Sequence, residues 1–175
     1  MPPARREKVI MQQQKSDSWR RDITLAAWPL AAVVVTSALG QWATFPNLVP
    51  WYASLIKPSF NPPNWIFGPV WTALYALMAF AAFRVLRLAP SPARRMALIL
   101  FFTQLALNAA WSWAFFAAHS PLLGLIDIVP QFVCVVATCV AFARLDRLAG
   151  LSLAPLVLWV GFAVALNGAI YALNG

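Results

Sequence analysis

Five apolar stretches, each long enough to cross a lipid bilayer, dominate the sequence and constrain its fold more than any other feature. A hydrocarbon core about 30 Å thick is crossed by roughly 20 apolar residues of helix. The stretches do not alternate polar and apolar residues, and an open sheet in lipid would leave backbone groups unpaired. The sequence therefore predicts an all-α polytopic membrane protein, a five-transmembrane-helix bundle. The expected spans are residues 23–45, 65–86, 97–118, 122–145 and 151–173.

The basic residues gather on one side of the predicted bundle. Of the 13 Lys and Arg residues, only Lys57 falls in a loop on the other side. The positive-inside rule then places the N-terminus in the cytoplasm. The net charge of +8 is explained by this topology and by contact with membrane lipids, so we expect no nucleic-acid partner. We expect the inner membrane of a bacterium, with the outer membrane of a bacterium or mitochondrion as the alternative.

The chain divides into a polar tail and one bundle domain. Residues 1–22 are polar and are expected to form a disordered cytoplasmic tail. Residues 23–175 then form the five-helix transmembrane domain. Its long connection, residues 46–64, contains five prolines, which fix the backbone and predict an ordered lid over the external mouth of the bundle. Within it, Pro50 suits the first position of a short helix whose apolar face would carry Trp51, Tyr52, Leu55 and Ile56.

Polar residues within the spans mark a candidate site. Gln104, Asn108 and Trp111 lie at i, i+4 and i+7 on one face of the third span. Because polar groups in lipid need partners, these amides either bond to neighbouring helices or line a cavity, and both alternatives stay open. Asp127 is the only acid within a span, and an intramembrane acid suggests function, although a position near the interface would let it meet water.

Aromatic residues suggest what such a cavity would accept. Trp71 and Tyr75 share a face of the second span, Trp159 lies midway along the fifth, and Trp51 and Tyr52 lie in the lid. If these rings converge, they form a cavity for a flat, hydrophobic small molecule. The alternative is an aromatic belt at the membrane surface, to which we assign Trp42, Trp65 and Trp113 instead.

A second face of the third span carries small residues. Ala106, Ala110 and Ala114 lie four residues apart, a spacing that lets two helix backbones approach closely. This stripe predicts a homodimer contact, with packing inside the bundle as the alternative.

Catalytic and metal-binding groups are scarce. The chain has one histidine, His119, and its two cysteines have no base beside them in sequence. Metal clusters are excluded on ligand count. We therefore predict no catalytic residue and no metal site, and we expect a binding protein rather than an enzyme.

The motifs together resemble the tryptophan-rich sensory protein and translocator protein family, also called peripheral benzodiazepine receptors. The resemblance covers residues 24–174 and rests on motifs that occur in the family's order. They are Trp51-Tyr52-x-x-Leu55-x-Lys57-Pro58, Pro62-Pro63-x-Trp65, Val70-Trp71-Thr72-x-x-Tyr75, Gln104-x-x-x-Asn108-x-x-Trp111, Pro155-x-x-x-Trp159 and Phe162-Ala163 with Asn167.

This resemblance implies a dimeric five-helix bundle that binds porphyrins and related tetrapyrroles in a cavity under the first loop. Family members are also associated with sterol and drug ligands, with stress sensing and with light-dependent porphyrin breakdown. The positions that match the family's pocket are Tyr52, Trp71, Asn108, Trp159, Ala163 and, in a looser alignment, Asp127. The chain departs from the family pattern at Phe60 and Leu156, where Trp and Tyr are usual, and Tyr171 is not followed by the basic residue of the sterol motif.

Our first functional hypothesis is therefore a membrane protein that binds tetrapyrroles, such as protoporphyrin or haem-like ligands, for transport or for stress or redox sensing. The alternatives are a light- and oxygen-dependent porphyrin-degrading enzyme and a ligand-independent membrane scaffold or regulator. No cofactor is required, since porphyrin or haem would be the ligand.

Overall fold

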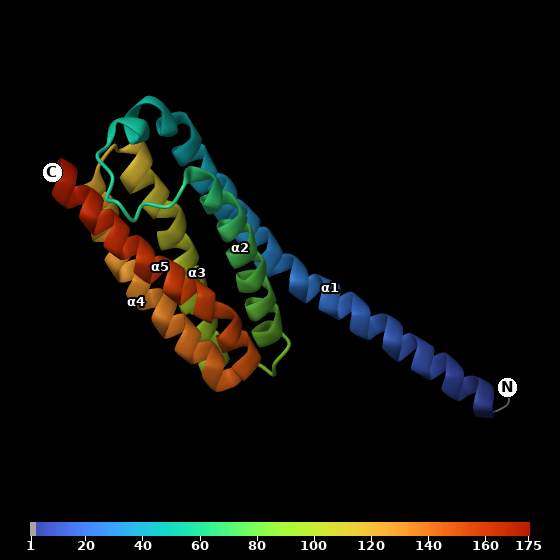
Figure 1. Ribbon diagram of the computed structural model, residues 1–175. Helices are drawn as coiled ribbons and strands as arrows, with labels where there is room; N and C mark the ends of the chain where they lie inside the picture. The colour runs from blue at the N-terminus through green and yellow to red at the C-terminus, as the bar shows by residue number, and fades with distance from the viewer. Residues whose placement is uncertain (1–2) are drawn as a thin grey trace.

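The computed structural model describes the backbone from Pro3 to Gly175 and the side chains from Trp19 onward. The described chain is all-helical, as expected, and has five long helices (Figure 1). They are α1 (Pro3–Thr44), α2 (Asn64–Leu86), α3 (Pro92–Ser112), α4 (Pro121–Leu145) and α5 (Arg147–Asn174). Each contains an apolar segment long enough to cross a membrane. The protein is thus an integral membrane protein with five candidate spans.

Side-chain caps fix where the last three helices begin. The hydroxyl oxygen of Ser91 accepts a hydrogen bond from the backbone N–H of Arg94 at 3.1 Å, and Ser120 caps α4 in the same way at 3.2 Å. The Asp146 carboxylate accepts from the Ala149 N–H at 2.8 Å. These bonds satisfy donors that the first helical turn leaves unpaired. The caps stand directly before their helices, and Asp146 alone separates α4 from α5.

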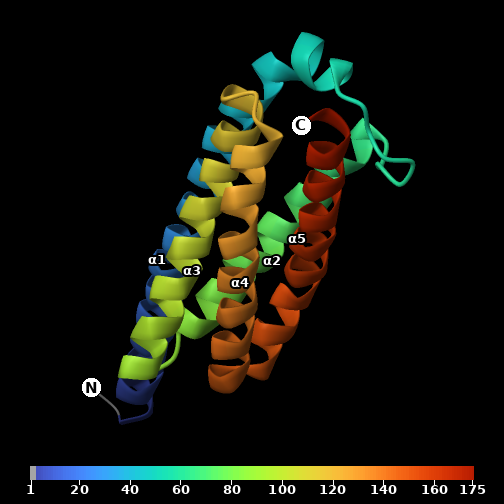
Figure 2. The ribbon, with the colours of Figure 1, turned by 90° about the vertical axis from the view of Figure 1, so that its left-hand side faces the viewer.

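The helices pack side by side (Figures 1 and 2), and the main apolar core lies between them. The helices α4 and α5 form an antiparallel hairpin, α3 packs against α4, and α1 lies beside α2 and α3. The Phe101 and Phe142 rings stack at 5.7 Å between α3 and α4. The Arg84 guanidinium at the end of α2 makes a two-pronged ion pair with Asp146, at 2.7 and 3.0 Å. The end of α2 is thereby joined to the start of α5.

The polar N-terminal segment differs from our expectation. We expected a disordered tail over residues 1–22, whereas α1 begins at Pro3 and continues through residue 22 into the first span. The physical reason is local: residues 4–28 contain no glycine or proline, and Gln, Lys and Arg, which favour helix, are frequent there. The division between a tail and a bundle domain stays a prediction.

Candidate functional site

One face of α2 carries the aromatic residues of the candidate site. Phe67, Trp71 and Tyr75 lie four residues apart, so they share that face. The Trp71 and Tyr75 rings lie 5.4 Å apart. One turn earlier, Phe67 meets Trp159 of α5 edge to face, with ring centroids 5.7 Å apart. The contact between α2 and α5 thus joins Trp159, which we predicted as a site residue, to Phe67, which we did not.

The amides of α3 also point inward, as predicted. The Tyr75 hydroxyl donates a hydrogen bond to Oδ1 of Asn108 at 2.7 Å, and Asn108 is only 6% exposed. Gln104 is fully buried, and its Nε2 donates to the sulfur of Met78 at 3.5 Å. Its Oε1 is buried and has no hydrogen-bond partner among the described residues. The amides therefore join α3 to α2, and the Gln104 oxygen is left without a described partner.

Trp111 is tied to α5 rather than to α2. Its indole Nε1 donates to Oδ1 of Asn167 at 3.0 Å, and Asn167 in turn donates to the Pro121 carbonyl at 2.8 Å. We did not include Asn167 among the site residues. The available signal was the same one that marked Gln104 and Asn108, namely an amide inside an apolar span. Ala163, one turn after Trp159, is half-buried and packs against the main core.

The lid packs against the end of α3. A helical turn begins at Pro50 after the extended residue Val49, and η2 (Leu48–Tyr52) contains this kink. Tyr52 is buried, with its ring 5.5 Å from Phe116 in the turn η3 (Trp113–Ala117), and its hydroxyl lies 3.4 Å from Oδ1 of Asn61. Trp51 meets Phe115 at 5.4 Å. The expected apolar face of this turn is confirmed for Trp51, Tyr52 and Leu55.

The expectation for Ile56 is wrong, because its side chain is 61% exposed. Hydrogen bonds between the Ile56 backbone and the Asn174 side chain explain this exposure. The Ile56 N–H donates to Oδ1 of Asn174 at 2.8 Å, and Nδ2 of Asn174 donates to the Ile56 carbonyl at 2.8 Å. This pairing fastens the lid to the end of α5 and leaves the Ile56 side chain outside.

The other lid residues stabilise the loop itself. The Lys57 ammonium donates to the carbonyls of Tyr52 and Leu55, at 2.7 and 3.1 Å, and lies 4.5 Å from the centre of the Tyr52 ring. Pro58 and Pro62 are half-buried, and Pro63 immediately precedes α2. Lys57 therefore closes the lid turn on itself.

These contacts divide the predicted pocket between two apolar clusters. Trp71, Tyr75 and Trp159 pack against the main core, whereas Tyr52 belongs to a second cluster beneath the lid. Trp111 packs against both clusters. Asp127 lies half-buried on α4, and its Oδ2 is buried without a hydrogen-bond partner among the described residues. The described contacts do not link Asp127 to the Tyr75–Asn108 pair.

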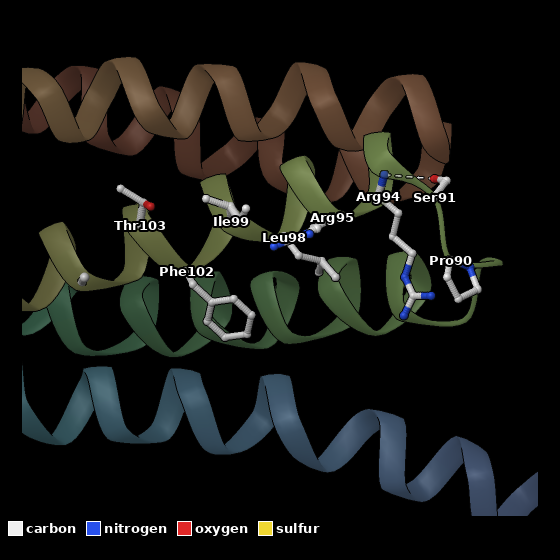
Figure 3. Close-up of a pocket in the computed structure, with 9 residues that line it drawn as sticks. Pro90, Ser91, Arg94, Arg95, Leu98, Ile99, Phe102 and Thr103 are labelled. Atoms are coloured by element: carbon white, nitrogen blue, oxygen red, sulfur yellow. Dashed lines mark hydrogen bonds between the residues drawn. The ribbon is translucent and has the colours of Figure 1, made fainter.

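The outer face of α3 carries the stripe of small residues and a surface groove. Ala106 and Ala110 are exposed and Ala114 is half-buried, so the first two do not pack inside the bundle. The groove, about 710 Å³ in volume, is lined by residues between Pro90 and Ala106. Figure 3 shows its basic end at Arg94 and Arg95. We call it the α3 groove. It lies on the outer face of the bundle and is separate from the site expected under the lid.

Comparison with known proteins places most of this chain in one family. The profile of the TspO/MBR family matches residues 28–173. The tryptophan-rich protein TspO of Chlorobaculum tepidum is 45% identical over 125 residues, which cover 71% of this chain and 79% of that protein. The protein of the same name from Archaeoglobus fulgidus is 40% identical over 145 residues, or 83% and 94% of the two chains. The human translocator protein is 36% identical over 126 residues, or 71% and 75%.

Proposed function

The chain belongs to the TspO/MBR family, and we propose that it binds a tetrapyrrole, such as protoporphyrin or a haem-like ligand, for transport or for sensing of stress or redox state. One observation carries this proposal. The aromatic face of α2 meets Trp159 of α5 on one side and the buried amide of Asn108 on the other. A flat macrocycle needs broad apolar surfaces and a few oriented polar groups, and this arrangement offers both.

The proposed pocket consists of Tyr52, Trp71, Tyr75, Gln104, Asn108, Trp111, Trp159 and Ala163, with Asp127 at its edge. The lid closes over it through Trp51, Lys57, Pro58, Pro62 and Pro63. The buried oxygen of Gln104, which lacks a partner among the described residues, supports the assignment of a polar contact there. An unsatisfied buried acceptor costs about 1–3 kcal/mol, and a ligand that donates to it would recover part of that cost.

The proposal is tested by titrating the purified protein in detergent with protoporphyrin in the dark and following tryptophan fluorescence. We expect saturable quenching, because Trp71 and Trp159 would contact the macrocycle. Quenching that rises linearly without saturation, as for unbound porphyrin, would contradict it. A protein that acts as a ligand-independent scaffold would give that second result.

One observation favours the degrading enzyme as a second candidate. The oxidisable rings of Trp71 and Tyr75 lie 5.4 Å apart, and in the proposed pocket both would stand beside a porphyrin that light excites in the presence of oxygen. The same titration under illumination decides between the candidates. A new porphyrin product that requires light, oxygen and Trp71 would favour the enzyme, whereas unchanged porphyrin would favour the carrier or sensor.

We further propose that the N-terminus lies in the cytoplasm and that the protein resides in a bacterial inner membrane. Arginines in the last turns of α2 and α4 and in the first turns of α3 and α5 support this orientation, because these turns lie at the same end of the bundle. Alkaline phosphatase fused after Gly175 should then be active in the periplasm. Activity of an N-terminal fusion alone would reverse the topology.

The proposed homodimer uses the outer face of α3. Ala106 and Ala110 are exposed there, and small side chains allow close backbone contact between copies. Ala110→Leu should shift the population in mild detergent from dimer to monomer, as measured by size-exclusion chromatography with light scattering. If Ala106→Leu and Ala110→Leu both leave the dimer unchanged, the interface lies elsewhere.

A further inference from the structure

The α3 groove combines a basic end with apolar walls. At the start of α3 it is bordered by Pro90, Ser91, Arg94 and Arg95. From there it continues along Leu98, Ile99, Phe102 and Thr103 (Figure 3) and ends at Ala106. The side chains of Ile99 and Phe102 are 48% and 46% exposed. A water-soluble protein would rarely leave such a surface open, whereas a membrane protein presents it to lipid.

The arginines at this end of the bundle differ in whether they are paired. Among the side chains that the structure describes, Arg84 pairs with Asp146 and Arg87 pairs with Asp22. Arg94 donates to the Leu88 carbonyl at 2.8 Å, which holds the loop before α3. Arg95 is exposed and forms no ion pair with a described acidic side chain. The groove therefore ends at positive charge that the described chain does not neutralise.

The length of the groove matches one leaflet of a bilayer. Ala106 lies eleven positions after Arg95, which corresponds to about 16 Å along a helix. That is roughly half of a hydrocarbon core about 30 Å thick. An extended acyl chain that starts at a headgroup beside Arg95 would thus follow the groove to its end near the middle of the bilayer.

We propose that the α3 groove binds an anionic phospholipid, with its phosphate at Arg95 and one acyl chain along Ile99 and Phe102. Charge distinguishes this occupant from a second copy of the chain. Two copies related by a twofold axis along the membrane normal would bring their own arginines to the same level. A lipid phosphate brings the opposite charge, and guanidinium groups bind phosphate by paired hydrogen bonds. The dimer stripe adjoins the groove at Ala106, so the lipid would border the dimer contact.

Native mass spectrometry of the full-length protein in detergent tests the proposal, with added phosphatidylglycerol as the anionic probe and phosphatidylcholine as the zwitterionic one. We expect phosphatidylglycerol to give a bound-lipid species at lower concentration. Arg95→Gln should weaken that binding about fivefold, the factor expected for one basic residue near an anionic lipid. Arg147→Gln, which removes an exposed arginine at the same end of the bundle but outside the groove, should leave it unchanged.

A second variant tests the acyl half of the site. Ile99→Trp fills the groove without changing charge and should weaken binding of phosphatidylglycerol, whereas circular dichroism and the thermal midpoint confirm that each variant folds. Equal binding of the two lipids, or equal loss in Arg95→Gln and Arg147→Gln, would overturn the proposal. The proposal would also fail if glycerol phosphate displaced phosphatidylglycerol and Ile99→Trp left phosphatidylglycerol binding unchanged. The site would then recognise the headgroup alone. If Arg95→Gln changes the dimer population but not lipid binding, a second copy occupies the groove and the proposal fails.

Discussion

The hydrogen bond between Tyr75 and Asn108 allows the two interpretations of the membrane amides to be separated. Its 2.7 Å length and the burial of Asn108 indicate a well-formed bond between α2 and α3. Interhelical bonds of this kind contribute about 0.6 kcal/mol on average and up to about 1.7 kcal/mol. Tyr75→Phe removes the donor and leaves Asn108 in place. With about 2–4 °C per kcal/mol for a chain of this size, the thermal midpoint should fall by about 1–7 °C.

The two variants differ in their expected effect on ligand binding. Asn108→Ala removes the amide that would contact the ligand, so the affinity for protoporphyrin should fall by about 2- to 13-fold, which corresponds to about 0.5–1.5 kcal/mol. Tyr75→Phe frees the Asn108 oxygen for the ligand, so the affinity should stay the same or rise. Fluorescence quenching gives the dissociation constant, and thermal unfolding in the absence of ligand gives the stability of each variant.

The controls are exposed residues of the same types. Tyr171→Phe and Asn64→Ala change side chains that lie on the surface and should affect neither measurement. If Tyr75→Phe and Asn108→Ala lower the midpoint equally while both bind protoporphyrin as tightly as the parent, Asn108 serves only to join helices. The double variant completes the thermodynamic cycle, and additive losses would show that the two side chains are not coupled.

Two further predictions concern the indoles and the loop between α4 and α5. Replacing both Trp71 and Trp159 with Phe should weaken protoporphyrin binding about 5- to 150-fold, since each indole contributes about 0.5–1.5 kcal/mol. Trp42→Phe, on the exposed surface, should leave the affinity unchanged. Equal affinity for all variants in a dark titration would disprove the pocket. The hydrogen bonds from Arg84 and then from the Ala149 N–H lower the pKa of Asp146, so its stabilising effect should be complete above the unfolded-state pKa of about 3.9 and decline as the pH falls through the lower folded-state pKa. Thermal midpoints measured across acidic pH should show this decline in the parent and not in Asp146→Asn, and identical pH profiles would refute it.

The sequence predicts the spans well because lipid leaves little choice. A backbone in hydrocarbon must pair its own groups, so an apolar run of sufficient length becomes a helix. The same principle located Gln104 and Asn108 on an inner face, since helical spacing fixes which side chains share a face. Exposure of Trp42 and Trp65, both 73%, agrees with their assignment to the outer surface. These predictions depend on local geometry and solvent alone.

Contacts between distant segments could not be derived in that way. The pairing of Asn174 with the Ile56 backbone joins residues 118 positions apart, and nothing in the lid motif indicates it. The separation of Tyr52 from Trp71 likewise depends on how the lid docks against η3. Phe67, which meets Trp159, was missed because one phenylalanine among 12 carries no distinguishing signal.

The distribution of bonds in the lid indicates how a ligand could enter. Lys57 bonds to carbonyls within the lid, so these bonds survive if the whole lid moves. By contrast, the described hydrogen bonds from the lid to the ends of α3 and α5 are those of Asn47 with His119, at 2.7 Å, and of Ile56 with Asn174. Asn47 also donates to the Ala43 carbonyl of α1 at 2.8 Å. The bonds to His119 and Asn174 lie at the exposed rim, where water can replace the lost partners at little cost. Inside, the Tyr75–Asn108 bond has no such replacement, so a ligand with polar substituents must compensate for any bond that it displaces there. An opening that moves the lid as one unit would therefore keep the Tyr75–Asn108 bond, and its main cost would be the exposure of Tyr52 and Trp51, which pack on Phe116 and Phe115.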